Sequence, residues 1–392
     1  MYCRTLKLTK KTKRGVAKFN KGDLKTDEFD TDFKNNIDVR VKHIRDELSC
    51  HVNQPVDNTD TMNKAFSPKE LSAALKRLKK KLWKACGSDG IHNWMIHFAS
   101  TDLHNALLDL YNKCWTESTY PDQWYETLIS YIYKGKGPLH EFTSYRPIAL
   151  TSTLVNIMKS MILARIALVI SKQLHQSQGG YRTGSGSKEQ LWALIEFLED
   201  GLQAETPALF CTTDVHKAFD QVYRNGTLYL RYCHGIRGRM LHMLDLWIQN
   251  NIAIQLWRGH LAPAIHLNAN GLRQGCVLSP IMYLLIINAL VAEAPFTTMP
   301  DWDDGFMATV FQQGVQPLRH RTDLTEWLVY LFVDDTAFVS KDIHTTNELL
   351  SKYHNFTRKW RIRVNSDKCK ILKNDFCEVM SWEIKSLELL SI

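Results

Sequence analysis

Residues 328–340 constrain the fold of this chain more than any other stretch. They read LVYLFVDDTAFVS, in which two apolar runs flank a pair of aspartates, Asp334 and Asp335. Val, Phe, Tyr and Leu favour strands and a short acidic break favours a tight turn, so the stretch predicts a β-hairpin. Adjacent carboxylates at the tip of a buried hairpin repel each other and lose hydration unless a cation, most simply a metal ion, lies between them. The alternative is a solvated Asp-Asp turn, and the hairpin alone favours that simpler interpretation.

The composition is that of a globular protein with a sizeable core. The chain has 392 residues, of which 44% are hydrophobic and 23% charged, enough for one large domain or two to three subdomains. The net charge of +8 is compatible with a polyanionic partner but does not establish one. The nine cysteines are scattered without a C-x-x-C pair, which argues against a zinc site or a disulfide framework and fits a reducing intracellular compartment.

The N-terminal segment, residues 1–65, is polar and begins with many lysines. It predicts either a nucleic-acid-binding arm or a solvated, partly disordered leader, and the leader is the simpler of the two. No apolar stretch typical of a signal peptide follows Met1. The longest apolar run, residues 281–292, is interrupted by Asn288 and is too short to span a bilayer, so we expect no membrane role.

Helix and strand signals follow this segment in a regular order. Ser67, Pro68 and Glu70 have the spacing of an N-cap, a first helical residue and the third position of a capping box. Apolar periodicity predicts further helices at residues 92–115 and about 153–171, with a strand-like run at 124–132 between them.

The loop at residues 178–187, QGGYRTGSGS, is rich in glycine and carries one arginine. Its backbone N–H groups could approach a phosphate closely, or the loop could be a flexible connection before a helix at residues 188–202. It matches neither a Walker A motif nor a dinucleotide fingerprint.

A possible partner for the hairpin aspartates is Asp214, which follows a short apolar strand at residues 208–213. A carboxylate at the end of one core strand can meet a carboxylate hairpin from neighbouring strands, and together they could bind two hard cations through oxygen ligands. Two Mg²⁺ about 3.5–4 Å apart can activate one oxygen and stabilise the leaving oxygen of a phosphoryl displacement. The alternative is that Asp214 only caps its strand.

The loop at residues 271–280, GLRQGCVLSP, precedes the apolar helix predicted at residues 281–292. Gly271 and Gly275 allow a ligand or a strand to approach closely. Arg273 and Gln274 supply hydrogen-bond donors. The helix itself is expected to be core, so any function lies in the loop.

Taken together and in this order, these stretches resemble the reverse transcriptases of non-LTR (LINE-like) retrotransposons. Each motif alone is weak to moderate, but six motifs in the order of the family make the resemblance specific, and it covers about residues 65–375. The matching motifs are residues 87–91 (GSDGI), 145–150 (YRPIAL), 178–182 (QGGYR), 214–220 (DVHKAFD), 271–280 (GLRQGCVLSP) and 332–335 (FVDD).

The resemblance implies an α+β right-hand polymerase, with fingers at residues 66–205, a palm at 206–375 and a short tail at 376–392. The palm would be an antiparallel sheet backed by helices. The implied activity is that of an RNA-directed DNA polymerase, which transfers dNTPs to the 3′-OH of a DNA primer on an RNA template with two Mg²⁺, or Mn²⁺. Such an enzyme is expected in the nucleus or in a cytoplasmic ribonucleoprotein. In the fingers, Arg182 would contact the template or the nucleotide.

The same resemblance implies roles for the palm motifs. Asp214 and Asp334 would be metal ligands, with Asp335 beside them and the backbone carbonyl of Val215 as a further ligand. Phe219, five residues after Asp214, would be the steric gate. Its ring would lie under the incoming sugar, where a 2′-hydroxyl would clash with it.

Further residues would contact the nucleotide. Lys134 and Arg146 would bind the triphosphate, where cationic donors offset the charge of the transition state. Gln274, with Gly275, would lie beside the templating pair. Lys368 would be a proton donor to pyrophosphate.

The sequence also departs from the family pattern. Ser88 stands where the family usually has proline, and residues 373–392 predict neither a primer-grip hairpin nor a helical thumb. Residues 293–326 are an insertion without an assignment. The thumb is therefore expected to be largely missing, and so is the family's endonuclease. We expect either a polymerase portion of a longer element or an inactive remnant that binds nucleic acid. A two-metal nuclease would use similar carboxylates but would give no reason for Phe219 and Gln274.

Overall fold

The structure is a computed structural model, and it describes most of the chain between residues 29 and 374. The described residues are 7–8, 29–51, 56–57, 59–175, 177–181, 186, 188, 190–191, 194, 208–267, 270–293, 328–340, 342–366, 368–374 and 382–383. The predictions for Arg182, for the insertion after residue 293 and for most of the helix at 188–202 therefore lie outside the described residues.

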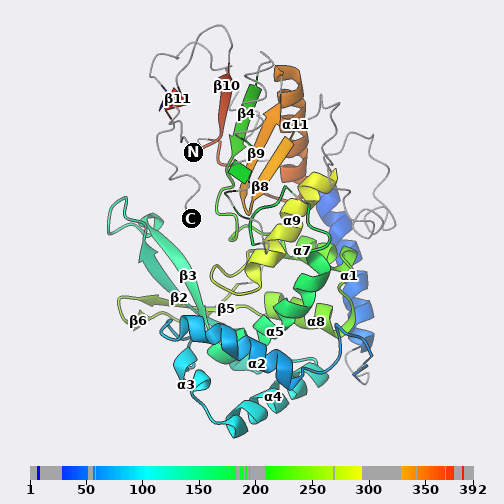
Figure 1. Ribbon diagram of the computed structural model, residues 1–392, viewed down its shortest axis with the longest axis vertical. Helices are drawn as coiled ribbons and strands as arrows, with labels where there is room; N and C mark the ends of the chain where they lie inside the picture. The colour runs from blue at the N-terminus through cyan, green and yellow to red at the C-terminus, as the bar shows by residue number, and fades with distance from the viewer. Residues whose placement is uncertain are drawn as a thin grey trace, which may run out of the picture.

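The predicted hairpin is present and lies in a four-stranded antiparallel sheet, called here the palm sheet. Its strands are β10 (Lys370–Asn374), β4 (Ala208–Thr213), β9 (Asp335–Ser340) and β8 (Leu328–Phe332), in that order. The order places β4, which leads to Asp214, directly beside β9, which starts at Asp335 (Figure 1). The antiparallel palm expected from the sequence is confirmed.

Two helices pack beside the palm sheet: α11 (Ile343–Lys359) contacts β9 and β4, and α9 (Ser279–Glu293) contacts α11 and α7 (Arg224–Cys233). The side chains of α9 from Met282 to Val291 are buried. A helix that is apolar all round is stable only inside a core, which confirms the interpretation of this helix as core.

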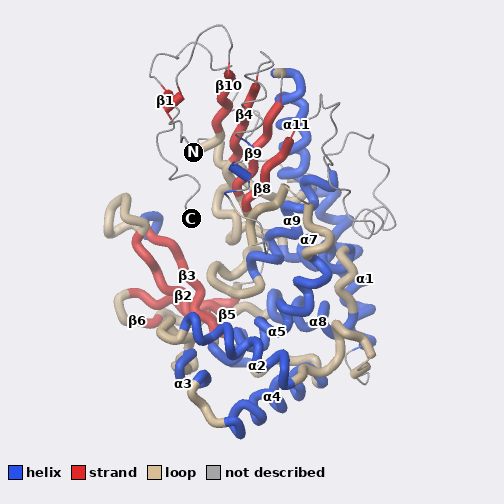
Figure 2. The backbone as a smooth tube through the Cα atoms, in the orientation of Figure 1, coloured by secondary structure: helices blue, strands red, loops and turns tan. Residues whose placement is uncertain are grey.

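A second sheet, called here the fingers sheet, has strand order β3-β2-β5-β6, with β7 on β5. The strands are β2 (Glu126–Tyr133), β3 (Tyr145–Thr151), β5 (Ile252–Trp257), β6 (His260–Leu261) and β7 (Ile265–His266). The palm range predicted from the sequence, residues 206–375, includes residues 252–266, but β5 pairs in parallel with β2. The chain therefore returns from the palm to the fingers sheet after α8 (Gly238–Gln249), as Figure 2 shows.

The helices of the fingers follow the sequence signals closely. The capping box at Ser67 and Glu70 is formed at the start of α2 (Pro68–Leu78). The helix expected at residues 92–115 is divided into α3 (Asn93–His97) and α4 (Thr101–Thr116), because Ser100 caps a new helix by accepting a hydrogen bond from the backbone N–H of Leu103. The remaining short elements are the 3₁₀ turns at Lys79–Lys81, Asp122–Tyr125 and Phe142–Ser144, and the strand pair β1 (Lys7–Leu8) and β11 (Trp382–Glu383).

Within the part of the chain that the structure describes, one helix, α5 (Thr153–Ile170), is long and apolar enough to cross a membrane by length and composition. More than half of this helix is buried among other elements, and a core helix passes the same test. It packs against α2, and this packing explains why its side chains are apolar.

The helix α1 (Thr31–His51) was not expected. Ile37, Val41, Ile44 and Leu48 are buried, and their spacing of four, three and four residues is that of one helical face. The helix packs against α7 and α8 and runs along one side of the molecule (Figure 1). Residues 31–51 are therefore part of the folded body rather than of a disordered leader, because this narrow apolar face is sufficient to dock a helix that is otherwise polar.

An unusual buried group in the core is Lys159 on α5, which is fully buried and has no hydrogen-bond acceptor among the described residues. Its ammonium lies 4.3 Å from the centre of the Trp247 ring, a cation–π contact that offsets part of the cost of burial. Burial lowers the pKa of Lys159 from 10.5 to about 7.

We predict that Lys159→Met raises the melting temperature at pH 7. Between the lowered pKa and the ordinary one the unfolded state binds more protons, so the wild-type protein gains stability as the pH rises. The advantage of the variant should therefore shrink between pH 7 and pH 10. Thermal unfolding across this range tests the prediction, with the exposed Lys172 changed to Met as the control. An advantage that is independent of pH would contradict it.

Candidate active site

The tip of the β8–β9 hairpin holds Asp334 in the turn and Asp335 at the start of β9. Phe332 pairs with Asp335, so the turn consists of Val333 and Asp334. Val333 has φ 61°, a left-handed conformation that is costly for a β-branched residue. Such a turn persists only if its surroundings hold it in place.

The glycine-rich motif supplies that support. The side-chain oxygen of Gln178, which is fully buried, accepts hydrogen bonds from the backbone N–H groups of Val333 at 3.2 Å and Gly180 at 2.8 Å. A Cβ atom on Gly180 would lie 2.6 Å from a methyl group of Val333. The backbone at Gln178 also pairs with Leu331 of β8. The start of this motif thus supports the hairpin, a role that neither of the two interpretations of the loop included.

Asp214 follows β4 and is held beside the segment that carries Lys368. The backbone oxygen of Asp214 accepts a hydrogen bond from Asn365 at 2.8 Å. The Lys368 ammonium lies 3.0 Å from one carboxylate oxygen of Asp214 and 3.2 Å from the other. The structure therefore brings together these two residues, which are far apart in the sequence.

The three aspartates form one region of concentrated negative charge. Burial raises the pKa of Asp335 to about 6, and the charges of Asp334 and Asp214 act in the same direction. Burial also raises the pKa of Asp334, with a smaller contribution from the charge of Asp214. The carboxylates therefore lie close enough to interact, and a cation among them would relieve both the repulsion and the loss of hydration.

The donor set fits a hard divalent cation, which prefers carboxylate and carbonyl oxygens. No described residue donates a hydrogen bond to the carbonyl oxygen of Val215, so this predicted ligand is available. Among the described residues, however, no three His, Cys, Asp or Glu side chains are arranged as a complete metal site. The Asp214 carboxylate is instead paired with the Lys368 ammonium.

The predicted steric gate, Phe219, is half-buried next to this region. Its ring stacks on the ring of Tyr283 from α9, with 5.2 Å between the centroids and 27° between the planes. Its backbone oxygen accepts a hydrogen bond from Leu272 at 2.7 Å. Gly271 makes this approach possible, because a Cβ atom there would lie 2.7 Å from the carbonyl oxygen of Asp220.

The comparison with known protein families decides the identity of this arrangement. A model of the family described as "Reverse transcriptase (RNA-dependent DNA polymerase)" matches residues 133–385, which include the three aspartates, Phe219 and Lys368. The chain belongs to the reverse transcriptase family. Polymerases of this family generally use divalent metal ions.

The relatives of this reverse transcriptase come from non-LTR mobile elements. The "RNA-directed DNA polymerase from mobile element jockey" of Drosophila melanogaster is 24% identical over 359 residues, which are 86% of this chain and 35% of the relative. The "Probable RNA-directed DNA polymerase from transposon X-element" of the same species is 25% identical over 310 residues, 77% of this chain and 31% of the relative. The chain thus spans about a third of the length of these relatives.

Two solved telomerase structures from Candida tropicalis are also similar. One is truncated from its C-terminal domain and has a TM-score of 0.43, with 14% identity over 74% of this chain and 59% of that chain. The other is in complex with a fragment of telomeric RNA and has a TM-score of 0.44, with 12% identity over 93% of this chain and 65% of that chain.

The predicted nucleotide-binding residues of this reverse transcriptase lie on or beside the fingers sheet. Lys134 and Arg146 are exposed on the β2–β3 hairpin, which projects beside the palm in Figure 1. The Lys134 ammonium donates to the backbone oxygen of Thr143 at 2.8 Å. Neither side chain has a contact with the palm carboxylates among the described residues. The structure therefore places both cations on one hairpin, and among the described residues it shows no contact between them and the aspartates.

Gln274 and Gly275 lie where the loop before α9 meets β3. The backbone oxygen of Gln274 accepts a hydrogen bond from Ala149 at 2.8 Å, and Gly275 has φ 102°. The side chain of Arg273 is buried and donates to Asn251 at 2.7 Å and to the backbone oxygen of Tyr125 at 2.9 Å. The loop that carries the predicted template-contacting residue is thus fixed to the fingers sheet.

Sequence reasoning missed three residues that hold the site together: Gln178, Tyr283 and Arg224. Arg224 is buried and donates to the backbone oxygens of Gly271 at 3.0 Å and Leu267 at 2.7 Å. A buried arginine and a tyrosine inside an apolar helix are weak signals of a supporting role. The supporting roles of Arg224 and Tyr283 become visible only when their partners, which are far away in the sequence, are known.

We predict that Gly271→Ala destabilises the protein more than Gly259→Ala. Both glycines have positive φ, +94° and +85°, but only at Gly271 would the new Cβ atom meet other atoms. The strained φ should cost about 1 kcal/mol at either position, and the clash with Asp220 should add about 1–3 kcal/mol at Gly271. Urea unfolding of the two variants measures the difference, and equal losses would show that the close approach at Gly271 is not required.

Proposed function

We propose that this chain is the polymerase part of a non-LTR retrotransposon protein and transfers dNTPs to the 3′-OH of a DNA primer on an RNA template. The observation that carries the proposal is the placement of Asp214, Asp334 and Asp335 at one end of the palm sheet with an aromatic gate beside them. The names of the relatives support the same reaction.

Asp214, Asp334 and Asp335, with the carbonyl of Val215, would hold two Mg²⁺ ions. Bound there, the ions would supply charge neutralisation for the attacking and the leaving oxygens of an in-line displacement. The palm sheet would fix the backbone of these residues, and the carboxylate of Asp214 would have to exchange its ion pair with Lys368 for the cations.

The residues around the carboxylates would orient the nucleotide. The ring of Phe219 would lie under the sugar and exclude a 2′-hydroxyl. Lys134 and Arg146 would bind the triphosphate as the fingers hairpin approaches the palm, with Arg182 as a further contact. Lys368 would place a positive charge next to Asp214 and would be the proton donor to the leaving pyrophosphate.

We predict that Asp334→Asn abolishes nucleotide incorporation. The amide keeps the size of the side chain but removes the negative charge, so the loss should be at least about 100-fold. Primer extension on an RNA template with Mg²⁺ and dNTPs measures it. Asp342→Asn is the matched control, because Asp342 is exposed and caps α11 through Thr345, and asparagine preserves a cap.

The same preparation distinguishes the second candidate, a remnant that binds nucleic acid without catalysis, which is motivated by the net charge of +8. That candidate predicts salt-dependent retention of RNA on filters without incorporation by the wild-type protein. Incorporation that survives in Asp334→Asn would instead refute the proposed active site.

We also predict that Phe219→Ala relaxes sugar selection. Removal of the ring opens the space that a 2′-hydroxyl needs, so the ratio of kcat/KM for dNTP over NTP should fall by at least about tenfold. Steady-state incorporation of matched dNTP and NTP substrates gives the ratio. An unchanged ratio would assign sugar selection to another residue.

A further inference from the structure

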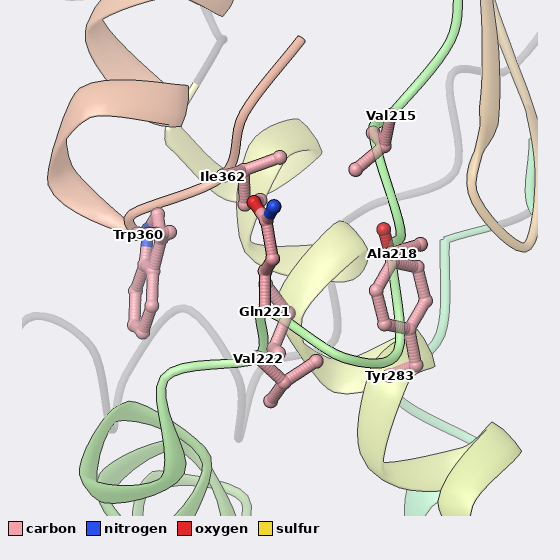
Figure 3. A pocket seen from close by; sticks show the side chains of 8 residues that line it. Val215, Ala218, Gln221, Val222, Tyr283, Trp360 and Ile362 are labelled. Atoms are coloured by element: carbon pink, nitrogen blue, oxygen red, sulfur yellow. The ribbon is translucent and has the colours of Figure 1, made fainter. Parts of the chain in front are cut away.

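Tyr283 is the largest polar side chain of α9 and lies under the gate. It is 1% exposed, and its ring stacks on Phe219. In Figure 3 the Tyr283 side chain extends from α9 toward Ala218 and Val215, and together they line a cavity of about 10 Å³. The ring therefore occupies the space between α9 and the turn that joins Asp214 to the gate.

The ring of Tyr283, and not its hydroxyl, accounts for the packing at this position. Its hydroxyl has no hydrogen-bond partner among the described residues, and an unsatisfied buried hydroxyl costs about 1–3 kcal/mol. A phenylalanine would fill the same space without this cost. Burial and the charges of the nearby aspartates, Asp334 first, raise the pKa of Tyr283 well above its usual value, so the hydroxyl remains a neutral donor that faces the acidic region.

The gate is held from two directions. Its backbone is fixed by the hydrogen bond from Leu272 to the carbonyl oxygen of Phe219. Its ring could otherwise turn about the side-chain bonds, and the stacked ring of Tyr283 restricts this rotation. Because the stack is nearly parallel, a change of the Tyr283 ring would change the height and tilt of the Phe219 ring.

We infer that Tyr283 is a positioning residue that sets the sugar selectivity of the enzyme by fixing the ring of Phe219. The inference rests on the proposed polymerase function. It means that sugar selectivity, which Phe219 exerts at the site, depends also on a buried residue of α9. It requires the aromatic ring of Tyr283 and does not require the hydroxyl.

The test is a double-mutant cycle between Tyr283 and Phe219, read as the kcat/KM ratio of dNTP over NTP. Tyr283→Leu should lower this ratio about tenfold, mainly through a lower KM for the NTP. Tyr283→Phe keeps the ring and should keep the ratio within about twofold. In a Phe219→Ala background, Tyr283→Leu should have no further effect, because the two residues act through one contact.

Two controls separate positioning from general destabilisation. Tyr111→Leu removes another fully buried tyrosine, on α4 in the fingers, and should lower stability without changing the ratio. Tyr283→Met fills the space with a flexible side chain and should lower the ratio as Tyr283→Leu does, even if the leucine variant fails to fold. Thermal unfolding shows which variants are folded.

The outcomes distinguish this inference from the proposed function. An active enzyme in which folded Tyr283→Leu and Tyr283→Met keep the wild-type ratio overturns the role of Tyr283 and leaves the polymerase assignment intact. Additive effects of Tyr283→Leu and Phe219→Ala overturn it as well. A wild-type protein that binds RNA but incorporates neither dNTP nor NTP overturns the proposed function, and the inference with it.

Discussion

The repulsion among three carboxylates at one end of the palm sheet is the constraint on which the rest of the structure depends. Asp335 is exposed and Asp334 and Asp214 are only partly buried, yet partial desolvation and the charges of the neighbouring carboxylates still raise the pKa values of Asp334 and Asp335. The surrounding elements hold this arrangement in place. Gln178 fixes the strained backbone of the turn, and Lys368 supplies a positive charge. The fold therefore concentrates negative charge at one place, where a bound cation would reduce the repulsion among the carboxylates.

The loop before α9 joins this acidic site to the fingers. One end of the loop is bound to the gate through Leu272 and Phe219, and the other is bound to β3 through Gln274 and Ala149. Arg273 fixes the middle of the loop to the start of the fingers strands. The loop thus links the fingers sheet to Phe219 through backbone hydrogen bonds, supported by the side chain of Arg273. If Gln274 and Phe219 have their proposed roles, this segment would link the position of the template to that of the sugar.

The sequence predicted the parts of this site that have local signals. Apolar runs on either side of Asp334 and Asp335 and a short strand before Asp214 predicted the palm strands, and the resemblance to the family predicted Phe219 as the gate. The role of Gln178 could not be predicted, because its partner Val333 is 155 residues away and a glycine-rich loop suggests mobility. The helix α1 was missed because four apolar residues are hidden among many charged ones. The pairing of β5 with β2 was missed because parallel pairing leaves no turn signal between the strands.

Tyr283 shows how far a single buried residue can connect these features. Its ring supports the gate, and its hydroxyl lies in the field of the carboxylates. The choice of sugar and the binding of cations are usually treated as separate properties of a polymerase. On the proposed function both would depend on where α9 lies, because Tyr283 of this helix stacks on Phe219 and the helix contacts α11 beside the palm sheet. A shift of α9 would change the space for a 2′-hydroxyl and the surroundings of Asp334 together, so selectivity and metal dependence in this enzyme should vary jointly rather than independently.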